Sequence, residues 1–493
     1  MRRLSLVLIL CLYPLAAQDA GLVLRTSVTY TTQRNSLSLT DEQKKEADRL
    51  SQEAREQSGN GNYAEAMRRY QDGMAVMRGV EWTPAVELIS SLQGHLDHAM
   101  LDPGKQVAVS LTPLYPSERA AGENVFASVF LVPVAKEGPE ERILGAKVAA
   151  DPTHLPFKTS VTLPETPNGD YNLEVRMTLA DGTSPQNLRT AFVKTLPIHI
   201  ESLSAQAERL KERLAKVTKR DAASLPTAQY VLARYEQTDH GNASPLHYNF
   251  QGEFATANAI LDALEAGRDP FAGKQGDLRK AYLSKVDQTL QPYRVFIPTQ
   301  YDGTKPTPLV VALHGMGGDE NSMFDGYGEQ LKVEAQRLGF LVACPKGRDT
   351  ASMYRGSAEQ DVMDVLAEVR RDYKVDSSRI YLMGHSMGGY GTWSVAIAHP
   401  DVFAALGPIS GGGNAAAMEK IKNLPEYVIH GDHDPTVNVN QSRTMVAAGK
   451  KVGAPIVYNE VPGGTHISVA QPAFAPMFDF FAKQSKPAAV STQ

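Results

Sequence analysis

The sequence predicts a modular protein with an α/β domain at its C-terminus, preceded by helical segments and a β-sandwich. The chain has 493 residues, which is too long for one compact core when a domain takes about 150 residues. Short stretches of alternating apolar and polar residues fill the region 103–200, as in a sandwich of antiparallel strands. Near-continuous apolar stretches alternate with helical ones over 275–485, as in a sheet covered by helices on both faces.

Composition and charge narrow the class of protein. Hydrophobic residues make up 42% of the chain and charged residues 21%, which is typical of a soluble globular protein. The net charge is −5 at pH 7. A nucleic-acid binder neutralises phosphates with clustered Lys and Arg, and the sequence has no such cluster. We therefore expect no nucleic-acid partner.

Residues 1–17 have the pattern of a secretory signal peptide. Arg2 and Arg3 precede the apolar stretch Leu4–Leu12, and small residues ending at Ala17 follow. We expect cleavage after Ala17 and export to the periplasm or the medium. A membrane span is disfavoured because the apolar stretch is shorter than the ~20 residues that cross a bilayer.

Two cysteines bear on processing and stability. Cys11 is a candidate lipid acceptor, but Leu10 before it is larger than the small residue usual at that place. Removal of the signal peptide would leave Cys344 alone, so that no internal disulfide could form. Cys344 lies in the apolar stretch FLVAC, which predicts a buried structural thiol.

The region 18–102 is predicted to be helical. Thr40 and Gln43 have the spacing of a capping box before a stretch of charged helix formers. Apolar residues then recur at spacings of three and four from Tyr63 to Met74, which indicates a helix with one apolar face. This segment resembles a single tetratricopeptide-type helix pair. Because such pairs bind partners as stacked copies and no second copy is found, we favour packing against neighbours and identify no protein partner.

The region 103–200 is the predicted sandwich. Its stretch NGDYNLEVRM resembles a late strand of immunoglobulin-like or fibronectin-like accessory domains of exported bacterial enzymes, which implies a spacer or a module that holds a polymer. We favour the spacer because no row of aromatic residues is found. A helical connector over 201–270, with helices near Glu201–Arg220, Pro226–Gln237 and Phe250–Ala266, and a flexible tail over 486–493 complete the predicted organisation.

The predicted C-terminal domain alternates strands with helices. The strand candidates are PYRVFIP, PLVVALHG, FLVACPKG, RIYLMGHS, FAALGPISG and EYVIHGDHD. The predicted helices are Glu329–Leu338, Ala358–Asp372, Met387–His399 and Val439–Lys451. Ser386 therefore lies where a strand meets a helix.

Ser386 is flanked by Gly384 and Gly388 in the pattern G-x-S-x-G. At a sharp strand-to-helix turn, glycines two positions away leave room for a backbone that presents the serine hydroxyl. The strand and helix on either side of Ser386 favour this nucleophile turn over an ordinary glycine-rich loop.

A nucleophilic serine needs a base and an acid. The base is a histidine, and a carboxylate orients it. With the chain order serine, acid, histidine that accompanies this turn, His466 in VPGGTH is the candidate base. The preceding strand end offers two candidate acids, Asp432 and Asp434. The neighbouring histidines match no established spacing of metal ligands, so we expect no metal.

An acyl-transfer site also needs donors for the oxyanion. The stretch His314–Gly318, HGMGG, follows a predicted strand with small residues that let the backbone approach a substrate. We expect the backbone N–H groups of Met316 and Met387 to be the oxyanion donors.

Residues 280–485 resemble the α/β-hydrolase superfamily through LHGMGG, GHSMGG, HPDVFAALGPISGG and HGDHDP. These motifs resemble those of polyhydroxybutyrate depolymerase-like and feruloyl or acetylxylan esterase-like enzymes, and also those of prolyl oligopeptidase-type catalytic domains. In this resemblance the aspartate before Pro435, Asp434, is the acid. The region upstream lacks the repeated blades of a propeller, which favours the esterases over the peptidases.

The sequence thus predicts an exported serine hydrolase that acts on carboxylic esters through Ser386, His466 and Asp434. Its substrate would be a small or polymer-linked ester, and no cofactor is implied. A prolyl oligopeptidase-type peptidase is the second hypothesis. An inactive binding or scaffold protein is the least favoured, because every part of the catalytic set is present.

Overall fold

The computed structural model describes residues 20–117, 125–135, 141–144, 148–150, 155–218, 222–246 and 248–487. Contacts within the chain divide it into two compact units: unit 1 comprises 1–204 and 237–248, and unit 2 comprises 205–236 and 249–493. The predicted signal peptide, with Cys11, lies outside the described residues, as do residues 488–493 of the predicted tail.

Unit 1 begins with a group of packed helices. They are α1 (Ala20–Ser36), α2 (Asp41–Gly59), α3 (Tyr63–Met77) and α4 (Pro84–Ser91). Helix α2 starts at Thr40 with the predicted capping box, in which Thr40 and Gln43 each bond the other's backbone N–H. Tyr30 of α1 is buried, and its hydroxyl donates to the carbonyl of Ala47 in α2 at 2.7 Å. These contacts hold α1 to the next helix.

The rest of unit 1 is built from two sheets. Its elements are β1 (Leu92–Leu96), β2 (Met100–Leu101), β3 (Gln106–Pro113), β4 (Val125–Pro133), β5 (Arg142–Ile143), β6 (Val148–Ala150), β7 (Phe157–Thr162), β8 (Gly169–Thr178), η2 (Gln186–Leu188), α5 (Arg189–Phe192) and β9 (Val193–Ile200). One sheet has the order β1-β3-β7 and the other β2-β9-β8-β4-β5, with β6 on β4. Buried residues of both sheets, such as Val109 and Val129, belong to one hydrophobic cluster.

Two strands of unit 1 lie inside the region 18–102 that the sequence predicts to be helical. Leu92 pairs with Pro113, and Leu96 pairs with Val109, so that β1 forms an antiparallel edge on β3. β2 pairs with β9. Both strands depend on partners distant in the sequence, which local periodicity does not reveal.

Unit 2 contains the predicted α/β domain. Its strands are β10 (Gly276–Leu283), β11 (Leu290–Ile297), β12 (Thr307–Leu313), β13 (Leu341–Pro345), β14 (Val375–His385), β15 (Ala405–Ile409), β16 (Glu426–Gly431) and β17 (Ile456–Val461). Its helices after the first strand are α9 (Ser322–Asp325), η3 (Tyr327–Glu329), α10 (Gln330–Leu338), α11 (Ser357–Asp372), α12 (Met387–Ala398), η4 (Ala415–Ile421), α13 (Asn440–Lys451) and α14 (Ala470–Phe481).

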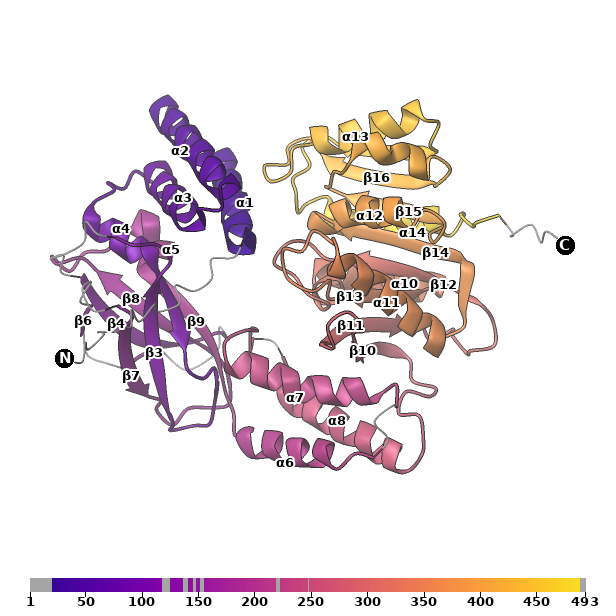
Figure 1. The fold of residues 1–493 in the computed structure, drawn as a ribbon, viewed down its shortest axis with the longest axis horizontal. Helices are drawn as coiled ribbons and strands as arrows, with labels where there is room; N and C mark the ends of the chain where they lie inside the picture. The colour runs from indigo at the N-terminus through magenta and orange to yellow at the C-terminus, as the bar shows by residue number, and fades with distance from the viewer. Residues whose placement is uncertain are drawn as a thin grey trace, which may run out of the picture. The chain divides into compact units, whose positions relative to one another are not determined.

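These strands form one sheet in the order β10-β11-β13-β12-β14-β15-β16-β17. β10, β11 and β13 pair antiparallel, and the pairs from β13 to β17 are parallel. Helices lie on both sides of the sheet (Figure 1). This mixed sheet with helices confirms the predicted α/β domain, and it adds β10 and β17 to the strands that the sequence predicts.

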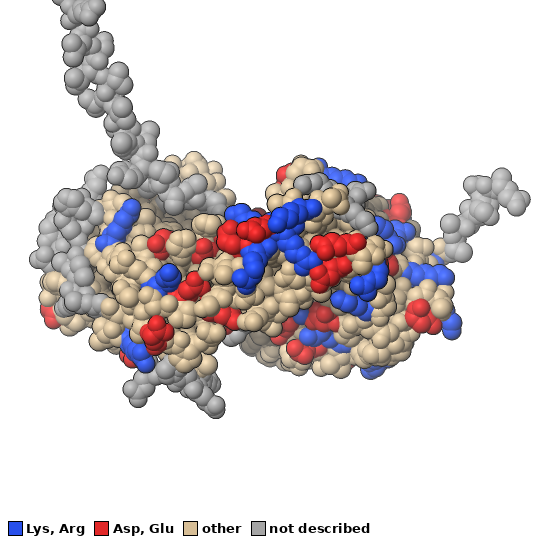
Figure 2. Space-filling view, turned by 90° about the horizontal axis from the view of Figure 1, so that it is seen from below, with Lys and Arg blue, Asp and Glu red and all other residues tan. Residues whose placement is uncertain are grey.

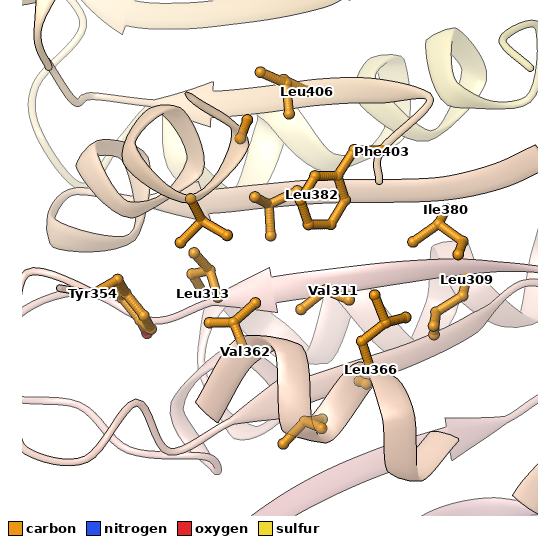
Figure 3. Packing of buried hydrophobic residues seen from close by; sticks show 14 of the residues in the cluster. Leu309, Val311, Leu313, Tyr354, Val362, Leu366, Ile380, Leu382, Phe403 and Leu406 are labelled. Atoms are coloured by element: carbon orange, nitrogen blue, oxygen red, sulfur yellow. The ribbon is translucent and has the colours of Figure 1, made fainter. Parts of the chain in front are cut away.

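Alternate residues of each central strand serve two cores. Val311 and Leu313 of β12 pack with Val362 of α11 on one face (Figure 3). Val310 packs on the other face in a cluster that includes Phe474 of α14. Because both faces are covered, the strand has no solvent side, which explains its near-continuous apolar sequence.

The predicted connector provides three helices, α6 (Ser204–Ala215), α7 (Leu225–Asp239) and α8 (Phe250–Glu265). Arg213 of α6 donates to Asn258 of α8 at 2.9 Å. The backbone N–H of Ala281 in β10 donates to Thr227 of α7 at 3.0 Å. Most of this segment therefore belongs to unit 2 and packs on its sheet.

Two surface properties complete the description. Within the described residues, no helix is both long and apolar enough to cross a membrane. On the face that Figure 2 shows, Lys and Arg side chains are interspersed with Asp and Glu side chains.

Candidate active site

Ser386 lies at the turn from β14 to α12. Its φ of 59° and ψ of −118° are far from the usual conformations of a residue with a side chain. Its backbone N–H donates to the carbonyl of Ile409 in β15 at 2.9 Å, and its carbonyl accepts from Tyr390 in α12 at 3.1 Å. These two bonds tie the strained residue to the neighbouring strand and to its own helix. The turn therefore holds the hydroxyl at the carboxyl end of β14.

The two glycines beside Ser386 are required by close backbone approach. A Cβ atom on Gly384 would lie 2.4 Å from the carbonyl oxygen of Gly388. A Cβ atom on Gly388 would lie 2.1 Å from the carbonyl oxygen of Leu313 in β12. Both distances are far below van der Waals contact, and backbone atoms cannot move aside cheaply. The helix can thus start directly against the central strands.

His466 joins Ser386 to Asp434. Its Nε2 lies 2.9 Å from Ser386 Oγ, and its Nδ1 lies 2.6 Å from Asp434 Oδ2. The Asp434 side chain is fully buried and that of His466 is 9% exposed. Since a carboxylate only accepts, Nδ1 carries the hydrogen and Nε2 is free to accept from the serine hydroxyl. The structure brings the three predicted residues together in the order that a serine nucleophile requires.

Asp434 is held by more than His466. Its Oδ1 accepts the backbone N–H groups of Thr436 and Val437, each at 2.8 Å. His430, which is also fully buried, places Nε2 3.2 Å from Oδ2. Burial acts to raise the pKa of Asp434, but hydrogen bonds from His430 and His466 outweigh it, and the pKa lies well below its ordinary value. The carboxylate is therefore ionised at neutral pH.

Asp432, the other candidate acid, makes different contacts. Its Oδ1 accepts the backbone N–H of Gly463 at 2.7 Å and lies 2.6 Å from Nδ1 of His433. The His433 side chain is 73% exposed. Asp432 thus braces the loop that leads to His466 without contacting the His466 ring, whereas Asp434 contacts it directly.

The loop His314–Gly318 lies against the serine turn. A Cβ atom on Gly315 would lie 3.4 Å from Cβ of Ser386. Within this loop, Gly317 N–H donates to Thr350 and Gly318 N–H donates to Gly315. Met387, the first residue of α12, has no intrahelical acceptor for its N–H. Both predicted oxyanion donors, at Met316 and Met387, are therefore on segments next to the hydroxyl.

A second loop, residues 346–356, supports the first. His314 Nε2 lies 2.7 Å from the carbonyl of Lys346, and the carbonyl of Thr350 accepts from Gly317 at 2.7 Å. Arg348 anchors this loop to the β10–β11 hairpin through Ser284 Oγ at 2.7 Å and Asp287 Oδ2 at 2.6 Å. Its Nε also lies 2.9 Å from the buried carboxylate of Asp361.

Two histidines of the site were missed as functional residues. His430 contacts Asp434, as described above. His385 precedes Ser386 and places Nε2 2.9 Å from the backbone carbonyl of His466. Their position inside the GHSMGG and HGDHDP motifs was the available signal, but only the fold shows which groups they contact.

Metal chemistry has no candidate cluster in the described part of the chain. The His, Cys, Asp and Glu side chains there form no group of three or more with a geometry suited to a metal ion. Cys344 is buried, and burial holds the pKa of its thiol well above the ordinary value.

Comparison with known proteins places the C-terminal region among hydrolases. A model of the prolyl oligopeptidase family matches residues 350–425. A bifunctional acetylxylan esterase/xylanase of Neocallimastix patriciarum is 29% identical over 138 residues, which are 27% of this chain and only 20% of that relative. A probable feruloyl esterase C of Aspergillus flavus is 30% identical over 222 residues, which are 43% of this chain and 79% of the relative.

A solved structure of a ferulic acid esterase from Anaeromyces mucronatus also matches. It has 16% sequence identity, covers 43% of this chain and 92% of its own, and superposes with a TM-score of 0.36. The family assignment therefore rests on the sequence relatives.

Proposed function

Since the chain belongs to the feruloyl esterase family of α/β-hydrolase serine esterases, we propose that this carboxylesterase-like hydrolase uses Ser386, His466 and Asp434 as a catalytic triad. The observation that carries the proposal is the pair of contacts made by one imidazole, 2.9 Å to the serine hydroxyl and 2.6 Å to a buried carboxylate. Apolar packing alone does not explain either contact, because each one pairs a hydrogen-bond donor with an acceptor in the protein interior.

The reaction follows from these contacts. Ser386 Oγ attacks the ester carbonyl carbon while His466 Nε2 takes the hydroxyl proton, and Asp434 stabilises the imidazolium that forms. The N–H groups of Met316 and Met387 donate to the oxyanion. His466 then gives its proton to the leaving alkoxide, which leaves as the alcohol, and an acyl group remains on Ser386. Water then loses a proton to His466 Nε2 and attacks the acyl carbonyl. As the bond between the acyl carbon and Ser386 Oγ breaks, His466 returns that proton to Oγ, which releases the acid and the free serine.

The substrate that we propose is a feruloyl ester, small or attached to a polymer. The relatives named feruloyl esterases support this class. We expect methyl ferulate to be hydrolysed with a higher kcat/KM than p-nitrophenyl butyrate.

Ester turnover by wild type and Ser386→Ala tests the proposal. Loss of the hydroxyl should lower kcat by roughly 10⁴-fold or more, and a fluorophosphonate probe should label one residue of the wild type, Ser386. Wild-type rates in the variant would refute the proposal. Ser394→Ala is a matched control, because the Ser394 hydroxyl donates to the helix carbonyl of Gly391 on α12, and its removal should leave the rates unchanged.

A peptidase is the second candidate, because the prolyl oligopeptidase family model matches residues 350–425. Two substrates that share one prolyl acyl group distinguish the two candidates. One is an ester of that prolyl group, and the other is its anilide. Faster cleavage of the proline anilide than of the ester would favour the peptidase.

We also propose that the chain is exported and that the two sheets of unit 1 form an immunoglobulin-like spacer. The arginines, apolar stretch and small residues of 1–17 support export, and the core shared by the two sheets supports a sandwich. N-terminal sequencing of protein secreted by an expression host should begin at Gln18. Retention of the full chain inside the cell would contradict export.

A further inference from the structure

The residue before the nucleophile is a buried histidine that bonds through both ring nitrogens. His385 is 2% exposed. Its Nε2 lies 2.9 Å from the backbone carbonyl oxygen of His466, and its Nδ1 lies 2.8 Å from the hydroxyl of Tyr327. The proposed catalytic steps do not use these bonds, and an apolar residue at this position would fill the space without them.

The two contacts assign the tautomer of His385. A carbonyl oxygen only accepts, so Nε2 must carry a hydrogen. Nδ1 then holds a lone pair if the ring is neutral, and the Tyr327 hydroxyl can donate to it. Every polar atom of the pair is satisfied by a neutral ring with its hydrogen on Nε2.

The surroundings of His385 favour this neutral form. Burial is the main cause that lowers the pKa of His385, to about 3, and the positive charge of His466 in its protonated form lowers it further. The negative charge of Asp434 raises the pKa of His385, and His430 lowers it. The ring of Tyr327 packs edge-on against the ring of His385, with the two centroids 5.7 Å apart.

His385 and Ser386 hold the same histidine by different groups. Ser386 Oγ contacts the His466 ring, and His385 Nε2 contacts the His466 backbone. Two consecutive residues of the turn therefore bond to one residue of a loop that is distant in the sequence. The rings of His385 and His466 also lie 4.7 Å apart between centroids. When His466 takes the serine proton, a neutral neighbour adds no repulsion to the new imidazolium, whereas a charged one would.

We infer that His385 is a positioning residue, which keeps the loop of the catalytic base in register with the nucleophile through the Nε2–H of a neutral ring. The His466 carbonyl selects this tautomer, and the Tyr327 hydroxyl satisfies Nδ1. The inference rests on the proposed function, because it gives His385 a role only if His466 is the base. If the inference holds, His385 contributes to kcat without contacting the substrate.

Kinetics of His385→Leu and His385→Gln test this inference. Leucine removes the donor to the His466 carbonyl, whereas glutamine can place an N–H near the Nε2 position. With each preparation normalised by fluorophosphonate active-site titration, we expect kcat to fall roughly tenfold to hundredfold in His385→Leu at little-changed KM, as for loss of a buried hydrogen bond in a catalytic array. His385→Gln should recover most of it.

The outcomes separate the two proposals. Wild-type kcat per titrated site in His385→Leu, or a His385→Gln variant as slow as the leucine variant, would overturn the positioning role. Activity retained by Ser386→Ala would overturn the triad instead. His399→Gln is the matched control: His399 lies at the far end of α12, where its Nε2 contacts Glu359 at 3.1 Å, and the wild-type kcat is expected.

The tautomer has a direct readout in the intact protein. Imidazole ¹⁵N shifts, with the His385 signal assigned by its loss in His385→Gln, should show the Nε2–H tautomer at neutral pH and down to the acid limit of folding. In Tyr327→Phe, the Nε2–H tautomer should persist, because the His466 carbonyl still accepts from Nε2. An imidazolium or an Nδ1–H ring in the wild type at pH 7 would overturn the inference.

Discussion

The Oδ2 atom of Asp434 lies 2.6 Å from Nδ1 of His466, a residue 32 positions later in the chain. Asp432, only two positions before Asp434, contacts the backbone of Gly463 instead. This contact distinguishes Asp434 from Asp432, which both lie just after the same strand and which spacing alone does not separate. It leads to the first prediction.

Asp434→Asn should lower kcat by roughly 10³–10⁴-fold, because an amide no longer stabilises the imidazolium and favours the wrong tautomer of His466. Asp432→Asn is the matched control and should keep kcat within a few-fold of wild type. Steady-state ester hydrolysis by both variants decides. Equal losses would mean that the aspartates act as a unit rather than through one contact.

His430→Leu should slow turnover roughly tenfold to hundredfold, since a hydrogen bond to a charged group contributes about 1.5–3 kcal/mol. Nε2 of His430 lies 3.2 Å from Asp434 Oδ2, the oxygen that also contacts His466, and Nδ1 of His430 lies 2.7 Å from Ser442 Oγ. The exposed neighbour His433 offers the comparison, because His433→Leu removes a histidine from the same loop without touching Asp434. A loss of the same size in both variants would argue against a specific role of His430.

Gly388→Ala should abolish activity through the fold of the turn. The added methyl would lie 2.1 Å from the Leu313 carbonyl, so α12 would have to move away from β12. Thermal unfolding and fluorophosphonate labelling should both be impaired. Gly59→Ala, where a Cβ atom meets nothing within 4 Å, should be folded and fully labelled. A stable, labelled Gly388→Ala protein would show that the glycine is not needed.

Arg348→Met should lower kcat more than it changes KM, because Arg348 anchors the loop that supports the oxyanion segment through Lys346 and Thr350. Arg348→Lys should recover part of the loss by restoring the charge near Asp361. Arg379→Met removes a partly exposed pair with Asp376 and should leave kcat unchanged. A pure KM effect of Arg348→Met would place the residue at the substrate instead.

Glu426 makes stability depend on pH. This residue is fully buried at the start of β16, and Trp393 of α12 donates to its Oε2 at 2.8 Å. Burial raises the pKa of Glu426 to about 7, against the hydrogen bond from Trp393, which lowers it. The folded state therefore holds a proton that the unfolded state releases above its ordinary pKa of 4.5. The free energy of unfolding should fall between about pH 4.5 and pH 7, by roughly 3 kcal/mol in total.

Glu426→Gln should remove that fall, because the amide is neutral at every pH. Denaturant unfolding at pH 5 and pH 8 measures it: the wild type should lose stability on going to pH 8, and the variant should lose much less. Glu419→Gln, at an exposed ion pair with Lys422, should follow the wild type. Parallel behaviour of Glu426→Gln and wild type would contradict the prediction.

Sequence patterns predicted the elements of the C-terminal domain that are buried on both faces. Strands such as β12 are apolar throughout, and their pattern requires no knowledge of their neighbours. β10 and β17 were missed for the opposite reason. β10 contains Arg279 and Lys280, and β17 alternates between half-buried and exposed residues at the sheet edge. Edge strands are specified by their pairing rather than by composition.

By itself, the sequence determined the reaction class and the segments that carry it, because the glycines around Ser386 and the order serine, acid, histidine are local or linear properties. Only the tertiary structure decided which atoms meet. It showed His466 in contact with Asp434, the acid that the motif resemblance had favoured over Asp432. It also brought His430 and His385 to the triad, and placed the 346–356 loop against the oxyanion segment. Hydrogen bonds form over about 3 Å between residues far apart in the chain, and the register of packed strands and loops, which no single stretch encodes, sets those distances.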